Sequence, residues 1–388
     1  SIRTALLDKS HPDVASSLAI LAELRREQGD YGRARALLDQ ALAINSKTYG
    51  ESALQVAGNL YEYGRLYYAM GELDQAERSL RRALTSYSDP NGRNGADSAR
   101  IKDYLAVVLQ ARGNYAEAER LYREAIVWDR AELGEDHPQY AVHLGNLAAV
   151  AHAQGRLDEA QTLFEVAIEK MTKIFGESHP ETIDALSNLG ALLQERKDFD
   201  GAEKAFRSAL DMDRQLRGET HSYVGIDLMQ LGSLAIARGR YAEAERLMRE
   251  ALDVFGKSLP DDHPYVATGI ANLGRALLEL RRYQEAEAML RKALALEVPV
   301  FGEDSENVAV ARISLARVLA AQRRHEEARS LFECGYQVLW NARGASAERT
   351  MQTRVWLTEF YRQTGRGAEA GNFIASLETP MRPSGAAH

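Results

Sequence analysis

A constant period runs through nearly the whole of this chain. The pair His137-Pro138 returns one period later as His179-Pro180, and His221 and His263-Pro264 follow at the same interval. Alanine marks the same phase without a gap, at Ala34, Ala76, Ala118, Ala160, Ala202, Ala244, Ala286, Ala328 and Ala370. A period of about 42 residues is typical of arrays in which each repeat is one small supersecondary unit that packs only against its neighbours.

Each period contains two stretches with the apolar spacing of a helix. In the fourth period, Leu144, Leu147 and Ala151 stand three or four residues apart and form one apolar stripe. Gly155 interrupts the pattern, as glycine does just after a helix, and a second stripe runs over 157–171. Every period therefore predicts a pair of antiparallel helices, and the chain is expected to be all-α.

Small residues recur where the two helices of a pair would cross. Two helices approach to about 8 Å only where the side chains between them are small. The first helix carries Ala22, Gly64, Ala106, Ala148, Gly190, Gly232, Gly274 and Ala316, and the second carries the alanines already named together with Ala41, Ala83, Ala125, Ala167, Ala209, Ala251 and Ala293. The pattern predicts that each helix pair packs closely.

Three short motifs carry a resemblance to a known family: Asn146-Leu147-Ala148, the run at 113–119 (GNYAEAE) and the run at 134–138 (GEDHP). They resemble the tetratricopeptide repeat, in the kinesin light chain-like subclass with about 42 residues in place of the usual number of about 34. The resemblance covers residues 11 to about 377. It implies a right-handed superhelical solenoid of antiparallel helix pairs, with about eight full repeats and partial terminal units.

The repeat register predicts how the chain divides, and a few segments depart from the repeat pattern. We expect the tail of a preceding repeat at 1–10, full repeats at 11–52, 53–94, 95–136, 137–178, 179–220, 221–262, 263–304 and 305–344, C-terminal capping helices at 345–378 and a disordered tail at 379–388. Residues 88–97 lack the His-Pro pair and add glycine and asparagine, which predicts a looser loop. Lys197, Arg281 and Arg323 replace the turn glycine of other repeats.

Composition and motifs argue against several functional classes. The net charge is −8 with no dominant basic stripe, which argues against nucleic acid as a partner. No apolar run approaches the roughly 18 residues of a membrane helix, so this segment is not expected to insert into a membrane. The single cysteine, Cys334, excludes an internal disulfide and is expected to be buried. No catalytic motif is found, so we predict no enzymatic activity and no cofactor.

The histidines at repeat starts are His11, His137, His179, His221 and His263, one in each of five repeats. A shared zinc site would need bonds of about 2 Å to several rings. Neighbouring repeats stack roughly 10 Å apart, so equivalent rings cannot share one metal ion. Helix capping or packing between repeats is the better interpretation, and no metal site is predicted.

The family resemblance implies that the first helix of each pair lines a concave groove. The residue before the recurring leucine of that helix is Asn146, Asn188, Gln230 or Asn272 in four consecutive repeats. A carboxamide donates and accepts hydrogen bonds at once and so suits a peptide backbone. The resemblance implies that this position contacts a bound peptide. The alternative is that these side chains cap or bridge neighbouring helices.

Cationic and aromatic residues extend the candidate groove. Arg275 and Arg317 occupy equivalent positions in adjacent repeats, where they could pair with an acidic side chain or a C-terminal carboxylate. The alternatives are a solvated charge or an internal pair of Arg275 with Glu279. Arg65 stands near Tyr61 and Tyr68, which are either rigid anchors for a ligand or part of the core.

Three functional hypotheses follow. The first is a scaffold that binds a protein or peptide partner in the groove. The second is a regulatory or sensor arm of a larger bacterial signalling protein, such as a kinase, an NTPase or a protease, because residue 1 is not Met and the first residues match only the end of a repeat. The third is a homodimer through the terminal helices. We expect a cytoplasmic location, or an extracytoplasmic one if a membrane helix precedes this segment.

Overall fold

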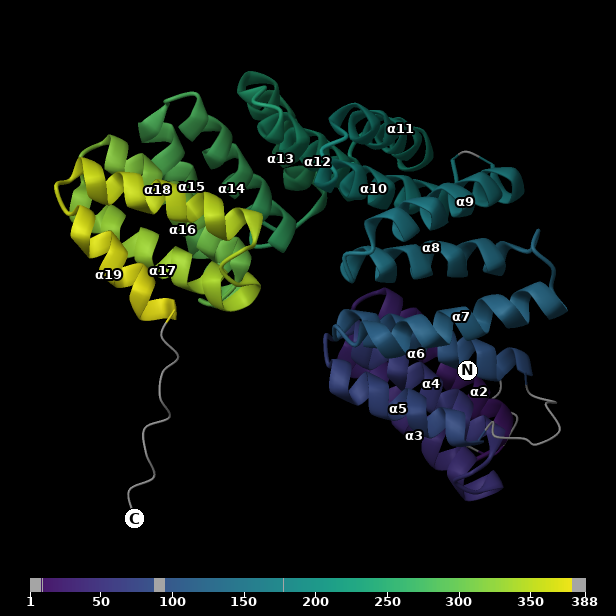
Figure 1. Ribbon diagram of the computed structural model, residues 1–388. Coiled ribbons are helices and arrows are strands. Elements are labelled where there is room, and N and C mark those ends of the chain that lie inside the picture. Colours follow the sequence, from purple (N-terminus) through teal and green to yellow (C-terminus); the bar gives the residue numbers. More distant parts are fainter. Residues whose placement is uncertain (1–7, 9, 87–94, 177, 379–388) are drawn as a thin grey trace, which may run out of the picture. The chain divides into compact units, whose positions relative to one another are not determined.

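The structure is a computed structural model that describes residue 8 and residues 10–86, 95–176 and 178–378. This part of the chain forms eighteen α-helices and contains no strand (Figure 1). The helices alternate as helix A and helix B of successive pairs. The A helices are α2 (Pro12–Glu27), α4 (Leu54–Ala69), α6 (Gly95–Ala111), α8 (Pro138–Ala153), α10 (Pro180–Glu195), α12 (Ser222–Ala237), α14 (Pro264–Glu279), α16 (Glu306–Ala321) and α18 (Glu348–Gln363).

The B helices complete the pairs and confirm the predicted all-α repeat solenoid. They are α3 (Tyr31–Tyr49), α5 (Leu73–Ser86), α7 (Tyr115–Glu132), α9 (Leu157–Phe175), α11 (Phe199–Arg217), α13 (Tyr241–Ser258), α15 (Tyr283–Phe301), α17 (His325–Arg343) and α19 (Gly367–Glu378). The loop predicted at 88–97, the preceding tail at 1–10 and the disordered tail at 379–388 lie wholly or mostly outside the described residues. The exact repeat boundaries stay a prediction.

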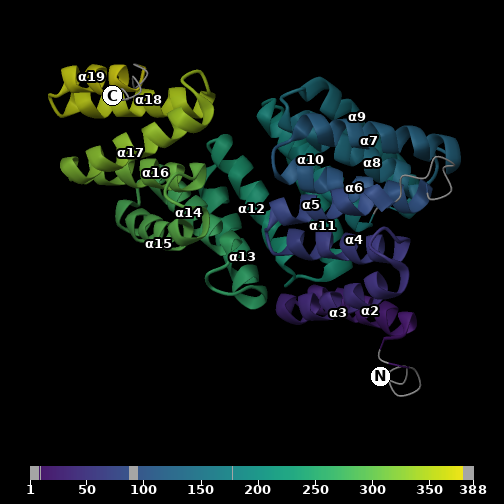
Figure 2. The ribbon, with the colours of Figure 1, turned by 90° about the horizontal axis from the view of Figure 1, so that it is seen from below.

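The chain divides into two compact units, Ser1–Glu177 with α2–α9 and Ser178–His388 with α10–α19. Within each unit, every A helix packs on its own B helix, and that B helix packs on the next A helix (Figure 2). Successive A helices also approach one another directly, as α2 and α4 or α14 and α16 do. Among the described B helices, comparable direct packing joins α17 and α19. The A helices therefore form the more crowded, inner layer of each stack.

The repeated histidines cap the A helices, as predicted. In His11, His137, His179, His221 and His263 the ring Nδ1 accepts a hydrogen bond from the backbone N–H two residues later, over 3.2–3.3 Å. Ser305 performs the same role with its hydroxyl oxygen, at 3.3 Å from the N–H of Asn307. Each cap satisfies one of the backbone donors that the first turn of a helix leaves unpaired.

The turn between helices A and B requires a left-handed backbone conformation. Glycine supplies it in most repeats, for example Gly155 with φ 76°. Lys197, Arg281 and Arg323 adopt the same conformation with φ of 65°, 59° and 63°. A side chain with a Cβ atom is disfavoured there, because Cβ crowds the following carbonyl oxygen. The three substitutions noted in the sequence are therefore small local strains in an otherwise regular turn.

In the pairs that carry glycine at the crossing, helices A and B approach so closely that no space is left for a Cβ atom at the glycine. A Cβ atom added to Gly190 would lie 2.6 Å from the ring of Phe206, and one added to Gly274 would lie 2.7 Å from Leu290. The alanines Ala34, Ala76 and Ala118 on the B side are 0% exposed. The small residues thus lie at the predicted helix crossings.

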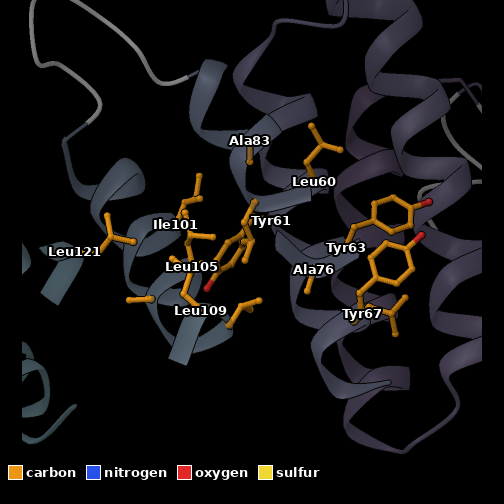
Figure 3. Packing of buried hydrophobic residues seen from close by; sticks show 14 of the residues in the cluster. Leu60, Tyr61, Tyr63, Tyr67, Ala76, Ala83, Ile101, Leu105, Leu109 and Leu121 are labelled. Atoms are coloured by element: carbon orange, nitrogen blue, oxygen red, sulfur yellow. The ribbon is translucent and has the colours of Figure 1, made fainter. Parts of the chain in front are cut away.

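Large side chains fill the space beside these crossings. Figure 3 shows the core of the first unit, in which Leu105 and Ile101 from α6 face Tyr61 from α4. The rings of Tyr63 and Tyr67 stack with centroids 5.8 Å apart. Burying side chains of this size contributes about 1.5–3 kcal/mol each, so the core between repeats, and not any single pair, stabilises the stack.

Restoring glycine to the turn should stabilise the protein. We expect Arg281→Gly and Arg323→Gly each to raise the free energy of unfolding by about 0.5 kcal/mol, because the left-handed strain disappears. Thermal unfolding followed by circular dichroism measures the effect. The matched Arg→Ala variants keep a Cβ atom and should give no gain; an equal gain from alanine would contradict the role of backbone strain.

Adding one methyl group at a helix crossing should destabilise the second unit. Gly190→Ala is expected to cost about 1–3 kcal/mol, because the buried ring of Phe206 has no free space to move into. Gly256 lies in α13 with open space around its Cβ position, so Gly256→Ala should be neutral or stabilising by about 0.5–1 kcal/mol. Chemical denaturation of both variants distinguishes crowding from helix propensity.

Candidate functional site

The outward faces of the B helices are covered by ion pairs between successive repeats. Arg81 bonds to Glu117 at 2.7 Å, and Arg156 bonds to Glu119 at 2.7 Å. The second unit repeats this arrangement, with other pairs such as Arg282–Glu245 at 2.7 Å and Arg324–Glu287 at 2.6 Å. Each of these four arginines is already matched by a carboxylate and so offers little unpaired charge to a ligand.

The inner A helices differ between the two units. In the first unit, Tyr61 is 8% exposed, and its ring meets the edge of the Tyr104 ring with centroids 5.8 Å apart. Tyr68 is half-buried and also meets Tyr104, at 5.7 Å. These contacts support the core alternative for Tyr61 more than the anchor role, whereas Tyr68 keeps part of its surface exposed.

Arg65 is already paired with carboxylates of its own unit. Its guanidinium donates to Glu23 at 2.7 Å and lies 3.2 Å from a carboxylate oxygen of Glu62. It also lies 5.8 Å from the centroid of the Tyr61 ring. These partners raise the pKa of Arg65 in spite of its burial. The first unit therefore brings Arg65 and Tyr61 together, as expected from the sequence, but as a closed cluster.

The four carboxamides do not share one environment. Asn146 belongs to the first unit and is half-buried, whereas Asn188, Gln230 and Asn272 belong to the second. Asn188 is exposed. The Oε1 atom of Gln230 is buried without a hydrogen-bond donor. A buried acceptor without a donor is costly, so Gln230 is well suited to accept a hydrogen bond from a ligand.

Asn272 is the centre of a small polar network in the second unit. Its Nδ2 atom donates to the hydroxyl of Ser233 over 3.4 Å, and its Oδ1 atom accepts from the guanidinium of Arg275 over 2.9 Å. Ser233 lies on α12, and the other two residues lie one turn apart on α14. The carboxamide thus bridges neighbouring A helices, as the alternative interpretation expected, while it also positions Arg275.

The two candidate arginines, Arg275 and Arg317, differ in their partners. Arg317 bonds to Glu279 at 2.7 Å, and its guanidinium lies 4.2 Å from the centroid of the Trp356 ring. The suggested internal pair of Arg275 with Glu279 is therefore wrong: Glu279 pairs across to the next A helix. Within the described part of the chain, Arg275 forms no ion pair.

The electrostatic surroundings of Arg275 are unfavourable for its charge. Burial lowers the pKa of Arg275 to about 10, and the nearby cations Arg349 and Arg317 contribute in the same direction, against the smaller opposing effect of Glu279. Arg349 itself is exposed at the start of α18. An anion placed beside Arg275 would relieve both the burial and the repulsion. This is the part of the inner wall best suited to a negatively charged group.

Trp356 was missed as a site residue, although the repeat predicts its place. It stands one period after Ser314 and so occupies the same register position as Asn272, but on α18. The predicted C-terminal capping helices at 345–378 contain α18 and α19, and their status as capping helices stays a prediction. The turn after α10 lies close to the start of α18, because Lys197 in that turn bonds to Glu348 at 2.8 Å.

Three remaining expectations concern the burial of Cys334, metal binding and membrane insertion. Cys334 is exposed and not buried as predicted, since its register equivalents are the polar Lys292 and Glu250. Among the described residues, no group of three or more His, Cys, Asp or Glu side chains is placed to hold a metal ion. None of the described helices combines the length and the apolar character that a membrane span requires.

Three solved structures are similar to this chain to different degrees, and the first two share its fold. The quorum sensor NprR from B. thuringiensis in its apo form shares 12% identity and a TM-score of 0.62, covering 94% of this chain and 98% of that chain. A signal transduction ATPase (STAND) protein with a tetratricopeptide repeat sensor, from Pyrococcus horikoshii, shares 15% identity and a TM-score of 0.59, covering 84% and 48%. BtubC (BKLC) from P. vanneervenii shares 25% identity and a TM-score of 0.47, covering 60% and 91%.

The sequence comparisons agree with the helix pairs and their register. Among curated proteins, none matches this chain. A family model described as tetratricopeptide repeat matches residues 2–89, 97–173, 143–215, 226–297 and 269–339. These matches cover most of the chain and follow the same succession of helices that the structure describes. The chain therefore belongs to the tetratricopeptide repeat family.

Proposed function

We propose that the chain is a scaffold that holds an extended peptide segment of a partner protein against its A helices, and that the second unit binds an acidic residue of that segment. The observation that carries the proposal is the isolation of Arg275. Arginines on the B helices such as Arg291, and Arg317 beside it, are matched by carboxylates, whereas Arg275 is held by Asn272 with no acid of its own.

The remaining inner residues suit a peptide backbone. The Oε1 atom of Gln230 lacks a donor, and Asn188 is exposed with both its amide donor and its acceptor accessible. A peptide presents alternating N–H and C=O groups, which carboxamides can satisfy in either direction. The ring of Trp356 lies against Arg317, and the hydroxyl of Ser233 accepts from Asn272, so both extend the surface available to side chains of the segment.

A second candidate is the regulatory or sensor arm of a larger signalling protein. The ATPase from Pyrococcus horikoshii carries its tetratricopeptide repeat sensor as part of a longer chain, of which this chain covers 48%. In that case the acidic segment would belong to another domain of the same protein. The homodimer through terminal helices stays a prediction alongside both candidates.

Peptide selection tests the proposed function. Short fluorescein-labelled peptides from a random library would be selected on the protein, and each hit with Asp or Glu would be resynthesised with Asn or Gln. We expect Arg275→Ala and the acid-to-amide change each to weaken binding by about tenfold or more, and not to add when combined, because they remove the same charge-assisted hydrogen bond. Fluorescence anisotropy measures the affinities.

The matched control is Arg291→Ala, which removes a paired arginine from the outer face of α15. It should leave peptide affinity unchanged. Equal effects of Arg275→Ala and Arg291→Ala, or selected peptides without acidic residues, would contradict the assignment of Arg275. Affinity that is unchanged in the triple variant Asn188→Ala, Gln230→Ala and Asn272→Ala would contradict the use of the A helices.

The same argument predicts that removing the charge of Arg275 stabilises the free protein, although it weakens peptide binding. Arg275→Met keeps the side-chain volume and removes a half-buried charge without an acidic partner, so it should stabilise the free protein by about 1 kcal/mol. Arg317→Met should instead destabilise it by about 1 kcal/mol, because Glu279 then loses its partner and Trp356 its cation. Chemical denaturation without peptide measures both; equal signs would refute the contrast between the two arginines.

A further inference from the structure

Buried polar and ionisable side chains occur at one repeating place in the stack. Near the end of helix B, the described structure buries Asn45 in α3, Asp129 in α7, Asp213 in α11 and Glu297 in α15. These four residues occupy one register position in every second repeat. At the same position, the intervening helices α9, α13 and α17 carry Met171, Phe255 and Leu339, while position 87 lies outside the described residues. From α7 onward, this register position therefore alternates between polar and apolar residues. We call the contact between such a polar residue and the next A helix of the same unit a polar joint.

The next A helix supplies a polar partner at three of the four polar joints. The residue 14 positions later is Asn59, His143, Asp227 or Ala311, and the first three are 3% exposed. At the first joint, the Nδ2 atom of Asn45 donates to the Oδ1 atom of Asn59 over 2.7 Å. This pair is neutral at every pH of interest. It provides an internal reference for the three ionisable joints.

The joint between α7 and α8 contains a histidine between two carboxylates. His143 Nδ1 lies 2.6 Å from Asp129 on α7, and His143 Nε2 lies 3.0 Å from Asp103 on α6. The Nε2 atom is also 3.2 Å from the amide of Gln139, and the ring lies near that of Tyr122. Burial opposes the charge, but the two aspartates outweigh it and raise the pKa of His143. The imidazolium form thus suits this joint.

The joint between α11 and α12 brings two buried carboxyl groups together. Ser187 on α10 donates to Asp227 over 3.4 Å, and Arg217 bonds to Asp213 while its guanidinium covers the Tyr223 ring. The Oδ2 atoms of both aspartates are buried without a donor. Burial first, and then the charge of Asp213 with a contribution from Asp184, raises the pKa of Asp227 to about 8. One proton between the two carboxyls removes their repulsion.

The joint between α15 and α16 contains a single acid. Glu297 is 1% exposed, faces Ala311 across the joint, and its Oε2 atom has no donor. In the part of the chain that the structure describes, no charged side chain on α14, α15 or α16 forms an ion pair with it. Burial alone raises the pKa of Glu297 to about 7. The neutral acid is therefore the form compatible with tight packing.

We propose that these three joints make the stacking of the repeats dependent on protons, so that each holds a proton in the tightly packed state and loosens when that proton leaves. The sign is the same at all three. His143 binds its proton more tightly in the folded state, so its contribution is complete below the unfolded pKa of about 6.5 and is lost as pH rises through the higher folded value. Asp227 and Glu297 also bind protons more tightly when folded. Their contributions therefore decline as pH rises from about 4 to the folded values near 8 and 7.

The three effects add, because none opposes another. The protein should be most stable in mildly acidic solution and should loosen between about pH 6 and about pH 9. Loosening is expected at α7–α8, α11–α12 and α15–α16, whereas the Asn45–Asn59 joint between α3 and α4 should not respond. The positions of the three ionisable joints thus determine where the packing between repeats loosens first as pH rises.

Two measurements test this inference. Thermal unfolding of the full chain from about pH 5 to about pH 9 should show a Tm that falls by roughly 5–10 °C between about pH 5 and about pH 8 and changes little above that. Hydrogen exchange with mass spectrometry, corrected for the intrinsic pH dependence, should show protection that falls by about tenfold or more at the three ionisable joints and not at α3–α4.

Variants that imitate the protonated acids provide the decisive comparison. Asp227→Asn and Glu297→Gln should raise Tm at about pH 8.5 by several degrees and match the native chain at about pH 5. Asp211→Asn is the matched control, because Asp211 is exposed on α11 and should change neither value. A Tm independent of pH, uniform exchange across all joints, or equal effects of Asp227→Asn and Asp211→Asn would overturn the proposal, and so would destabilisation by Asp227→Asn at every pH.

Discussion

The close crossing of helices A and B is the constraint on which the whole array depends. At Gly190 and Gly274 the opposing side chain occupies the space of a Cβ atom, so the two helices of a pair approach with little freedom. A pair fixed in this way buries only one side of each helix and must stack on its neighbours. Because the crossings recur at the same register position, successive A helices such as α12, α14 and α16 approach one another within a unit, whereas most B helices do not. The chemistry of the inner wall follows from that division.

Much of this arrangement is readable in the sequence. The helix pairs and the histidine caps each depend on residues close in the chain, and each agrees with the expectation. The sequence also shows that Arg281 and Arg323 replace the turn glycine, and the structure gives both a positive φ. The environment of Arg275 could not be predicted, because Glu279 is one turn away on the same helix yet bonds to Arg317 on the next. Which of two arginines takes one carboxylate depends on the rotation of α14 against α16, which the repeat pattern leaves undefined.

The distribution of matched and unmatched charge separates the surfaces of the molecule. Outer arginines such as Arg324 have two glutamates within bonding distance, and such exposed pairs contribute little to stability. Inside, Arg275 lacks an anionic partner, and the buried acids have oxygen atoms without a hydrogen-bond donor. A ligand would supply the partner of Arg275, and a proton would neutralise each acid. Both conditions reduce the stability of the free protein at neutral pH. Both also allow its surroundings to change how tightly it is packed.

The alternation of polar and apolar joints has a consequence for how an array of this kind can be shortened. Removing one repeat after Asp129 would set that carboxylate against Ala185, in a joint with no partner for it. Removing two would set it against Asp227, a group able to share a proton. Although the helix geometry recurs with every single repeat, the interchangeable building block is therefore a tandem of two repeats. A version shortened by two repeats after Asp129 therefore keeps a polar residue opposite that carboxylate, whereas a version shortened by one repeat does not.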